Sequence, residues 1–443
     1  MSDAPAITGP QRALLVGLQM ADQSREDAAA LLEELAELTA NVGLTVAASH
    51  LVRLREPHPR FLLGAGKTEE IIQDARARGC AYIIFDDELH AAQQRNWEAA
   101  SNLQVIDRHE VILDIFSARA HTREARLQVE LAQQEYSLPR LRRAWTHLSR
   151  QRGGGSTQRG EGETQLQLDH RLVRDRIQRL TADLAVVRKQ RAVQRRQRLR
   201  APVPTAAIVG YTNAGKSSLL NALTGSDALV QDKLFATLDP ATRRLPLPSG
   251  RTLLLTDTVG FVRRLPHRLV EAFKATLEEA LVSDFLIHLV DASSPHAASH
   301  HATTLAVLAE LGASEARLIT VFNKVDRVSD PLWLAELKSQ FPGALFVSTR
   351  TRQGLDLLLD QIENGLADET VPMMLLIPHS RYDLINRLHQ AGAVRCEEAR
   401  DDGVYIQGLV PRRWLEVVRP YVLKNPDPIP HPLVAPASGH AVA

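Results

Sequence analysis

The residues with the clearest chemical potential form a glycine-rich run. Gly210-Tyr-Thr-Asn-Ala-Gly-Lys-Ser217 matches the pattern G-x-x-x-x-G-K-[ST], directly after an apolar stretch and directly before a helical one at 218–223. In such a run the glycines let backbone amides curl around phosphates, Lys216 reaches the β and γ phosphates, and the Ser217 hydroxyl ligates Mg2+. The run therefore predicts a nucleoside triphosphate site with magnesium.

Two further motifs stand at the ends of apolar stretches. Asp257-Thr-Val-Gly260 lies 41 residues after Lys216, where the carboxylate would hold a magnesium-bound water and the glycine amide would sense the γ-phosphate. Asn323-Lys-Val-Asp326 ends in an aspartate that can accept both the N1 and N2 hydrogens of guanine. Adenine lacks that donor pair, and a buried acceptor left without donors costs about 1–3 kcal/mol. GTP, not ATP, is the predicted substrate.

Weaker assignments complete the predicted site. Ser348-Thr-Arg350 stands where GTPases usually carry Ser-Ala-Lys, so we expect backbone support of the guanine there, although Thr349 departs from alanine. Thr237, in Phe235-Ala-Thr-Leu-Asp-Pro240, would complete the magnesium shell, and spacing alone supports it. We expect catalytic roles for Lys216, Thr237 and Gly260, and magnesium ligation by Ser217 and Thr237. The expected GTP contacts are Gly210, Tyr211, Thr212, Asn213, Ala214, Gly215, Lys216, Ser217, Ser218, Phe235, Ala236, Thr237, Asp257, Thr258, Val259, Gly260, Asn323, Lys324, Asp326, Ser348, Thr349 and Arg350.

The elements that must position these residues alternate between strands and helices. We expect an N-terminal α/β domain at 1–118, with a largely parallel sheet of strands 14–18, 44–47, 82–85 and 103–106 and helices 25–39, 68–78 and 90–100. A P-loop domain is expected at 201–368, with strands 206–209, 252–256, 285–291, 318–322 and 344–347. A small C-terminal α+β domain should fill 369–443, with strands 374–377 and 404–409 and a loose tail from 426.

The region between the first two domains, 119–200, is strongly basic. It holds 20 basic and 8 acidic residues, a net charge of +12 in a chain whose net charge is +1. Pro139 should end a first helix, a loop with five glycines is expected at 151–163, and a coiled-coil rhythm follows at Leu166, Val173, Ile177, Leu180, Leu184 and Val187. Two antiparallel helices with a glycine-rich tip are predicted. The charge favours a polyanionic partner, a solvated helical face being the alternative.

Composition excludes several other classes of protein. Cys80 and Cys396 have no ligand-like neighbours, so neither a disulfide framework nor a zinc site is indicated. The N-terminus does not begin like a signal peptide. Apolar runs such as 285–290 stop far short of the ~20 residues needed to span a bilayer. We expect a cytoplasmic monomer, with loose membrane association left open.

Beyond the nucleotide motifs, the sequence resembles the HflX family of ribosome-associated GTPases over nearly its whole length. The segments that carry the resemblance are Asp107-Arg-His-Glu-Val-Ile-Leu-Asp-Ile-Phe116, Leu127-Gln-Val-Glu-Leu131, Leu138-Pro-Arg-Leu141, Gly160-Glu-Gly-Glu-Thr-Gln165, Phe235-Ala-Thr-Leu-Asp-Pro240 and Asp257-Thr-Val-Gly-Phe261. The resemblance implies docking on the large ribosomal subunit near its peptidyl transferase region, and dissociation or rescue of stalled ribosomes, particularly after heat stress. The glycine-rich loop would then be a probing tip, with Arg150, Arg152 and Arg159 as candidate rRNA contacts; a plain inter-helix connection is the alternative.

Two residues beside the motifs bear on catalysis. Phe261 stands where many switch GTPases carry a glutamine that orients the attacking water, and a phenyl ring cannot replace it. A bound cation, a residue such as Arg263, or the ribosome acting in trans must then supply the catalytic group. In related GTPases an asparagine at the position of Asn213 helps to hold a potassium ion against the phosphates, which makes K+ a candidate cofactor.

Other segments of the sequence allow alternative interpretations. Gly64-Ala-Gly-Lys-Thr68 resembles a phosphate loop, but Phe61 stands where a Walker motif needs glycine, so we predict a turn and helix cap. Use of ATP by the N-terminal region, reported for some family members, stays open. A ribosome-assembly or tRNA-modification GTPase is the alternative function, although residues 371–443 lack the G-x-x-G loop of Era-like proteins and Cys396 is too far from the end for a reactive cysteine motif. A scaffold with a vestigial site is disfavoured by the intact Lys216, Ser217, Asp257, Asn323 and Asp326.

Overall fold

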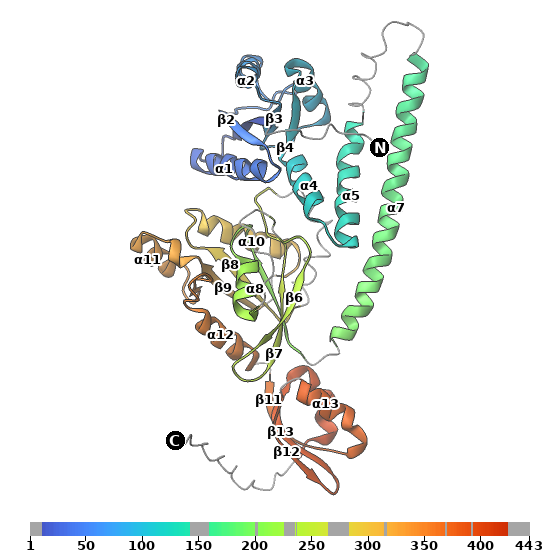
Figure 1. Cartoon of the computed structure of the whole chain (residues 1–443), viewed down its shortest axis with the longest axis vertical. Coiled ribbons are helices and arrows are strands. Elements are labelled where there is room, and N and C mark those ends of the chain that lie inside the picture. Colours follow the sequence, from blue (N-terminus) through green and yellow to red (C-terminus); the bar gives the residue numbers. More distant parts are fainter. Residues whose placement is uncertain are drawn as a thin grey trace, which may run out of the picture. The chain divides into compact units, whose positions relative to one another are not determined.

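The structure is a computed structural model that describes most of the chain, namely residues 11–141, 159–199, 203–225, 235, 237–264, 283–313, 317–367, 370–390 and 393–423. The chain divides into two compact units. The first comprises Met1–Arg198, Thr205–Arg244 and Leu254–Leu355, and the second comprises Leu199–Pro204, Leu245–Leu253 and Asp356–Ala443. Figure 1 shows the elements of both. The protein is multidomain α/β and includes a P-loop domain, as the sequence predicts.

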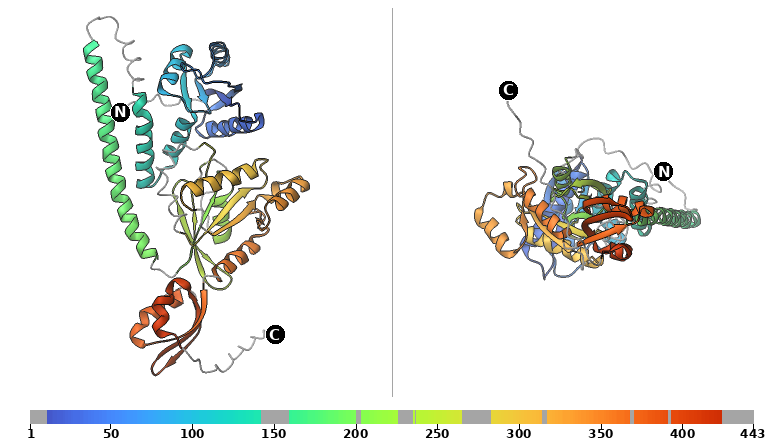
Figure 2. Two further views of the ribbon diagram at one scale, coloured as in Figure 1. Left: turned by 180° about the vertical axis from the view of Figure 1, so that it is seen from behind. Right: turned by 90° about the horizontal axis from the view of Figure 1, so that it is seen from below.

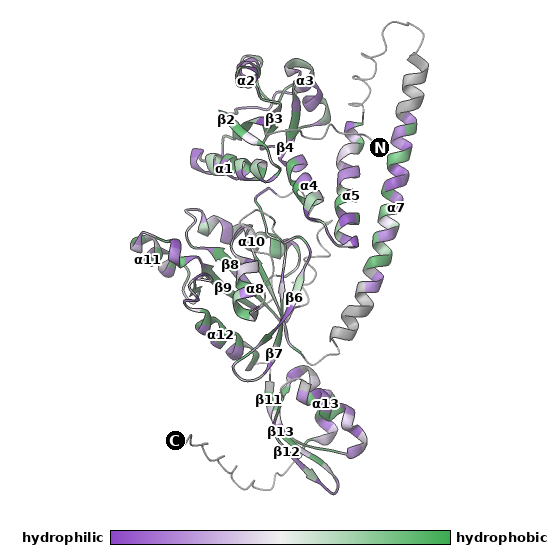
Figure 3. Cartoon of the chain, viewed as in Figure 1, coloured by the Kyte–Doolittle hydropathy of each residue, from purple (hydrophilic) through white to green (hydrophobic). Residues whose placement is uncertain are grey.

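A four-stranded parallel sheet forms the N-terminal domain. Its strand order is β2-β1-β3-β4, with β1 at Arg12–Gln19, β2 at Thr45–Arg53, β3 at Tyr82–Phe85 and β4 at Gln104–Asp107. The helices between the strands are α1 (Arg25–Asn41), α2 (Ala65–Ala77) and α3 (Ala91–Ser101). Sheets covered on both faces are built from nearly continuous apolar strands, and β1 and β3 are accordingly buried over most of their length. Figure 3 colours the elements by hydropathy. Gly64 is the N-cap of α2, which confirms the predicted turn and helix cap.

Helices follow the sheet along the chain, and the first of them was missed by the sequence reasoning. This is α4 (Arg108–Arg119), capped by the Asp107 side chain. Next come α5 (Arg123–Ser137), which ends just before Pro139 as predicted, a short 3-10 turn η1 (Leu138–Arg140), and the long α7 (Arg159–Leu199).

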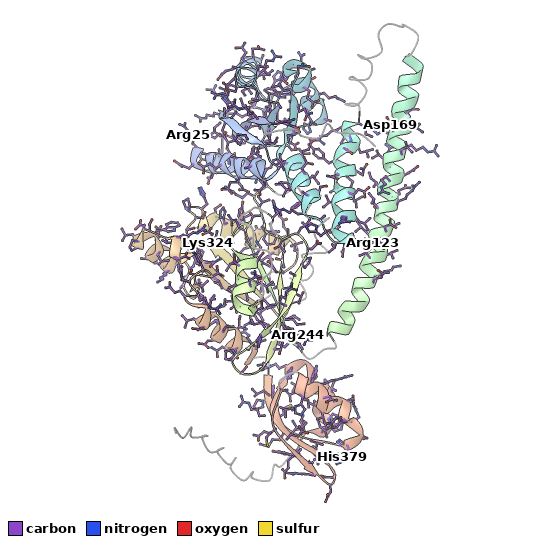
Figure 4. All side chains as sticks on the ribbon, in the orientation of Figure 1. Arg25, Arg123, Asp169, Arg244, Lys324 and His379 are labelled. Atoms are coloured by element: carbon purple, nitrogen blue, oxygen red, sulfur yellow. The ribbon has the colours of Figure 1, made fainter. Side chains whose placement is uncertain are left out.

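The helices α5 and α7 run side by side in Figures 1 and 2, and Arg176 of α7 pairs with Glu130 of α5. Leu180 and Leu184 of the predicted coiled-coil seam are buried, while Val173, Ile177 and Val187 are half-buried. Figure 4 labels Arg123 on α5 and Asp169 on α7. Because α7 already begins at Arg159, the last five residues of the expected loop are helical; residues 142–158, with Arg150 and Arg152, and the side chain of Arg159 lie outside the description.

The P-loop domain contains a six-stranded sheet in the order β10-β9-β8-β5-β7-β6. The pairs from β10 through to β7 are parallel. Its strands are β5 (Thr205–Gly210), β6 (Ala241–Pro246), which was not expected, β7 (Thr252–Asp257), β8 (Phe285–Asp291), β9 (Arg317–Asn323) and β10 (Leu345–Phe346). Helices α8 (Lys216–Thr224), α10 (Ala297–Glu310) and α11 (Pro331–Gln340) and a 3-10 turn η2 (Val325–Arg327) accompany this sheet, while α12 (Leu355–Ala367) belongs to the second unit except for its first residue. The carboxyl ends of parallel strands meet at one edge, so the motifs that follow β5, β7 and β9 share that edge.

The second unit holds a small antiparallel sheet in the order β11-β13-β12. Strands β11 (Thr370–Ile377) and β13 (Gly403–Pro411) extend the two predicted strands, and β12 (Val394–Arg400) was missed. Helix α13 (Tyr382–Gln390) packs its apolar side chains into the same core as the sheet. The predicted tail from 426 lies outside the description. Among the described residues, no helix is both long enough and apolar enough to span a membrane.

Candidate functional site

The glycine-rich run forms the loop between β5 and α8. Gly210 has a φ of 154°, and a Cβ there would overlap the Leu289 carbonyl of the neighbouring strand; Gly215 has a φ of 94°, and a Cβ there would overlap the Asn323 side chain. Only glycine fits both positions. The Asn323 amide also donates to the Ala214 carbonyl at 2.9 Å. The loop is therefore braced by the end of β9.

Lys216 opens helix α8 and curls back over the loop. Its Nζ donates to the carbonyls of Gly210 at 3.2 Å and Tyr211 at 2.8 Å. Burial lowers the pKa of Lys216 to about 8, an effect that the nearby Asp257 carboxylate opposes. Such a lysine is already placed beside the loop amides, and an anion held there would favour its charged form.

Three oxygen-bearing side chains converge from three separate segments. Ser217 Oγ lies 2.7 Å from Thr237 Oγ1, and both hydroxyls donate to Asp257 Oδ2, at 2.7 Å and 2.9 Å. Burial raises the pKa of Asp257, and its other oxygen, Oδ1, is buried with no hydrogen-bond partner in the part of the chain that the structure describes. Oxygen ligands of this kind suit Mg2+ and the water molecules that it carries. The structure thus brings together the three residues that the sequence linked to magnesium.

The residues predicted to recognise the base lie where β9 and β10 end. Asn323 Oδ1 accepts from the backbone amide of Thr349 at 3.1 Å. Ser348 Oγ donates to Asp326 Oδ1 at 2.6 Å, which fixes the aspartate's orientation. Lys324, labelled in Figure 4, has a φ of 63° and pairs with Asp291 at 2.7 Å. The residues of both predicted base motifs are therefore connected, and the geometry gives Ser348 a side-chain contact that the sequence did not indicate.

The segment after β7 is tied to the phosphate loop through its backbone. Thr212 N donates to the Phe261 carbonyl at 2.8 Å, and Phe261 N donates to the Gly210 carbonyl at 3.1 Å. The Phe261 ring is 1% exposed and belongs to the core of the first unit. Arg263, which the sequence offered as an intrinsic source of catalytic charge, donates its Nε to Glu34 of α1 at 3.1 Å. In this structure its guanidinium is therefore held by the N-terminal domain.

Other predicted contacts are less engaged. Asn213 is exposed, with a φ of 58°, and Arg350 is also exposed. Thr258 uses its hydroxyl to donate to the Ile208 carbonyl at 2.7 Å. Ala236 lies outside the described residues.

Sequence reasoning missed a buried ionic network that joins the N-terminal domain to this site. Arg108 at the start of α4 is 1% exposed and pairs with Glu34 at 2.6 Å and Asp86 at 2.7 Å. The Glu34 carboxylate also accepts from the Tyr211 hydroxyl, at 2.8 Å. Arg108 further donates to the Arg263 carbonyl at 3.0 Å. The available sequence signal was Glu34, a charged residue among the leucines of an otherwise apolar helix face.

Replacing Arg108 by methionine should lower the free energy of unfolding by about 3–5 kcal/mol, because two buried carboxylates lose their shared cation. Urea titration followed by circular dichroism measures the change. Arg264→Met is the matched control. Arg264 pairs with Asp86 and Asp87, but its side chain is 32% exposed, so we expect a loss of about 1 kcal/mol or less. Equal losses in the two variants would contradict the importance of the buried network.

A second contact missed by the sequence reasoning joins the Thr237 segment to α5. The Asp239 carboxylate accepts from the backbone amides of His121 and Thr122, at 3.1 and 3.0 Å, and from the Thr122 hydroxyl. Thr122 is the N-cap of α5, and its hydroxyl accepts from Ala125 N. The first turn of α5 is thus held by a residue two positions beyond Thr237.

Three family models match successive parts of the chain. Their descriptions are "GTP-binding GTPase N-terminal" over residues 29–117, "GTP-binding GTPase Middle Region" over 119–198 and "50S ribosome-binding GTPase" over 205–324. Among solved structures, a GTP-binding protein from the archaeon Sulfolobus solfataricus, in complex with GDP, is 24% identical with a TM-score of 0.42; the match covers 80% of this chain and 98% of that one.

Full-length relatives give the stronger comparison. GTPase HflX of Akkermansia muciniphila is 47% identical over 412 residues, which cover 90% of this chain and 94% of the relative. GTPase HflX of Escherichia coli is 39% identical and covers 89% of this chain and 92% of the relative. With identity at this level over about nine-tenths of its length, the chain belongs to the HflX family of GTPases.

Proposed function

We propose that this GTPase binds the large ribosomal subunit and couples hydrolysis of GTP to the dissociation or rescue of stalled ribosomes under stress. The observation that carries the proposal is the pairing of a complete GTPase site with a helical arm, α5 and α7, inside a region of net charge +12. Neutralising rRNA phosphates releases counterions, which favours binding of such a region to RNA. The "50S ribosome-binding GTPase" description of the model matching 205–324 supports the same partner.

In the nucleotide site we assign the phosphates to the loop amides of residues 210–217 and to Lys216. The guanine is assigned to Asn323 and Asp326, with backbone support from Ser348 and Thr349. Mg2+ would be held by the hydroxyls of Ser217 and Thr237, and the unpartnered Asp257 Oδ1 suits a magnesium-bound water. When bound, the ion supplies positive charge where negative charge develops on the phosphates. Gly260 leaves room for Lys216 and Thr212 beside it.

Co-sedimentation with ribosomal subunits tests the proposal. The protein should sediment with large subunits in the presence of a non-hydrolysable GTP analogue, more weakly with GDP, and less as salt rises. Changing Arg150, Arg152 and Arg159 together to alanine should weaken this association by about 10-fold or more, since three phosphate contacts would be lost. GTP binding should be unchanged.

A matched control removes the same charge elsewhere. Arg243, Arg244 and Arg327 are exposed in the P-loop domain, and their replacement by alanine should leave subunit association nearly intact. Undiminished association of the first triple variant would contradict the docking role of the tip. Association with small subunits alone would instead favour a ribosome-assembly function.

We also propose that K+ assists hydrolysis through Asn213, which is exposed at the rim of the phosphate loop. A cation held against the phosphates would stabilise charge that develops during transfer, and loss of one comparable contact costs other enzymes about 10²- to 10³-fold in rate. Hydrolysis should therefore be faster in potassium than in sodium at equal ionic strength. Asn213→Ala should abolish the difference between the salts. Equal rates for the unchanged protein would leave Asn213 a plain loop residue.

A further inference from the structure

Two side-chain oxygens beside the phosphate loop are buried without a hydrogen-bond partner among the described residues. One is Asp257 Oδ1, already assigned to the magnesium shell. The other is the hydroxyl of Thr212, a residue that is 6% exposed. A buried hydroxyl is normally hydrogen-bonded, and one left unpaired in a folded protein calls for a functional explanation. The two oxygens lie on neighbouring parts of one site, since the Thr212 backbone is bonded to the segment that Asp257 begins.

The position of Thr212 is fixed by its backbone and its packing. Its amide donates to the Phe261 carbonyl at 2.8 Å, next to a parallel bridge between Tyr211 and Phe261. A Cβ built on Gly260 would lie 2.9 Å from Thr212 Cγ2 and 2.9 Å from Lys216 Nζ. The Thr212 side chain and the lysine ammonium therefore flank the same side of Gly260. In P-loop proteins that lysine reaches the β and γ phosphates.

This placement gives the hydroxyl a ligand of definite chemistry. The Lys216 ammonium and the Gly260 amide are the groups expected to meet the γ-phosphate. The Thr212 side chain lies beside both groups, and its unpartnered hydroxyl can donate one hydrogen bond to a phosphoryl oxygen. Hydrogen bonds to charged oxygens are the stronger class. Phe261 occupies the position at which many GTPases carry a glutamine that orients water, and its side chain is buried in the core.

We propose that Thr212 is a catalytic residue whose hydroxyl donates a hydrogen bond to an oxygen of the γ-phosphoryl group. During hydrolysis water forms the new bond to phosphorus, the bond to the oxygen that bridges the β and γ phosphates breaks, and GDP leaves with that oxygen and its electron pair. Both protons of the water stay on oxygens of the released inorganic phosphate. Thr212 keeps its proton throughout. Its contribution is to stabilise charge on the transferring group, and its bond also favours GTP over GDP in the ground state.

Single-turnover hydrolysis by the full chain without ribosomes, together with the affinities for GDP and a non-hydrolysable GTP analogue, tests this assignment. Thr212→Val keeps the shape of the side chain and removes the hydroxyl. It should slow hydrolysis by about 10- to 100-fold and weaken binding of the GTP analogue more than binding of GDP. Thr212→Ser keeps the hydroxyl and should retain hydrolysis to within a few-fold. Because the valine variant removes an unpaired polar atom, its folding should not suffer.

The matched control is Thr39→Val. Thr39 is fully buried in α1, where its hydroxyl donates to the Leu35 carbonyl, and its loss should leave hydrolysis unchanged. The proposal would be overturned if Thr212→Val had the same single-turnover rate as the unchanged protein and the same ratio of affinities for the GTP analogue and GDP. An equal loss in the serine and valine variants would also overturn it, since shape and not the hydroxyl would then matter. Both readouts are independent of ribosome binding.

Discussion

GTP hydrolysis by the isolated protein should be slow and should rise by about 10³- to 10⁵-fold on addition of large ribosomal subunits. Phe261 occupies the place of the water-orienting glutamine and is buried in the core. Arg263, the candidate within the chain that the sequence offered, is engaged by Glu34. A catalytic group supplied in trans is then the economical source, and an arginine supplied in this way has an effect of that size in other GTPases.

Phosphate release measured in potassium buffer, with and without large subunits, checks this expectation. Small subunits at the same RNA concentration are the control for non-specific effects of polyanions, and they should not stimulate. Fast turnover of the isolated protein that does not respond to large subunits would refute the in-trans source. In that case Glu34→Gln would show whether Arg263 acts within the chain, because that variant loosens its ion pair.

Asp326→Asn should change the base that the protein accepts. In the site that we propose, the carboxylate accepts from both donors of guanine, and hydrogen bonds to charged groups are worth about 1.5–3 kcal/mol each. The variant should therefore bind GTP about 10²- to 10⁴-fold more weakly. It should gain affinity for xanthosine triphosphate, whose 2-oxo group presents an acceptor where guanine presents a donor.

Affinities for GTP and xanthosine triphosphate, measured by calorimetry at fixed salt, test this change of base preference. Ser348→Ala is the informative companion, because Ser348 orients Asp326 through a 2.6 Å bond without supplying its carboxylate. In that variant the affinity for GTP should fall by about 10-fold, and the affinity for xanthosine triphosphate should not rise. An unchanged preference for GTP in Asp326→Asn would remove Asp326 from base recognition.

The sequence predicted the features that depend on short-range order. The strands at Tyr82–Phe85 and Phe285–Asp291 coincide with the predicted ranges, because runs of apolar residues bounded by polar ones determine buried strands locally. From the spacing of the motifs, the sequence also linked Ser217, Thr237 and Asp257 to one magnesium site, and the structure places the three side chains together. The sequence failed at β6 and β12, whose half-exposed or exposed residues carry no apolar run.

The ionic network could not have been predicted in the same way. Glu34, Arg108 and Arg263 are 74 and 155 positions apart along the chain, and nothing local indicates that their charges meet. Charged side chains are usually solvated, so each would be assigned to the surface. Only the packing of α1 and α4 against the segment that follows Gly260 buries them and pairs them. The same is true of Asp239, whose partners lie in residues 121–122.

Because of the Asp239 contact, hydrogen exchange at the beginning of α5 should depend on the order of the segment that carries Thr237. Helix ends open locally with free energies well below that of global unfolding, and the cap sets how often they do so. Here the cap residue Thr122 and its neighbour His121 donate three hydrogen bonds to the Asp239 carboxylate. Amide hydrogen exchange at Ala125, in the first turn of α5, would therefore report the order of residues 237–239 without any label on the nucleotide.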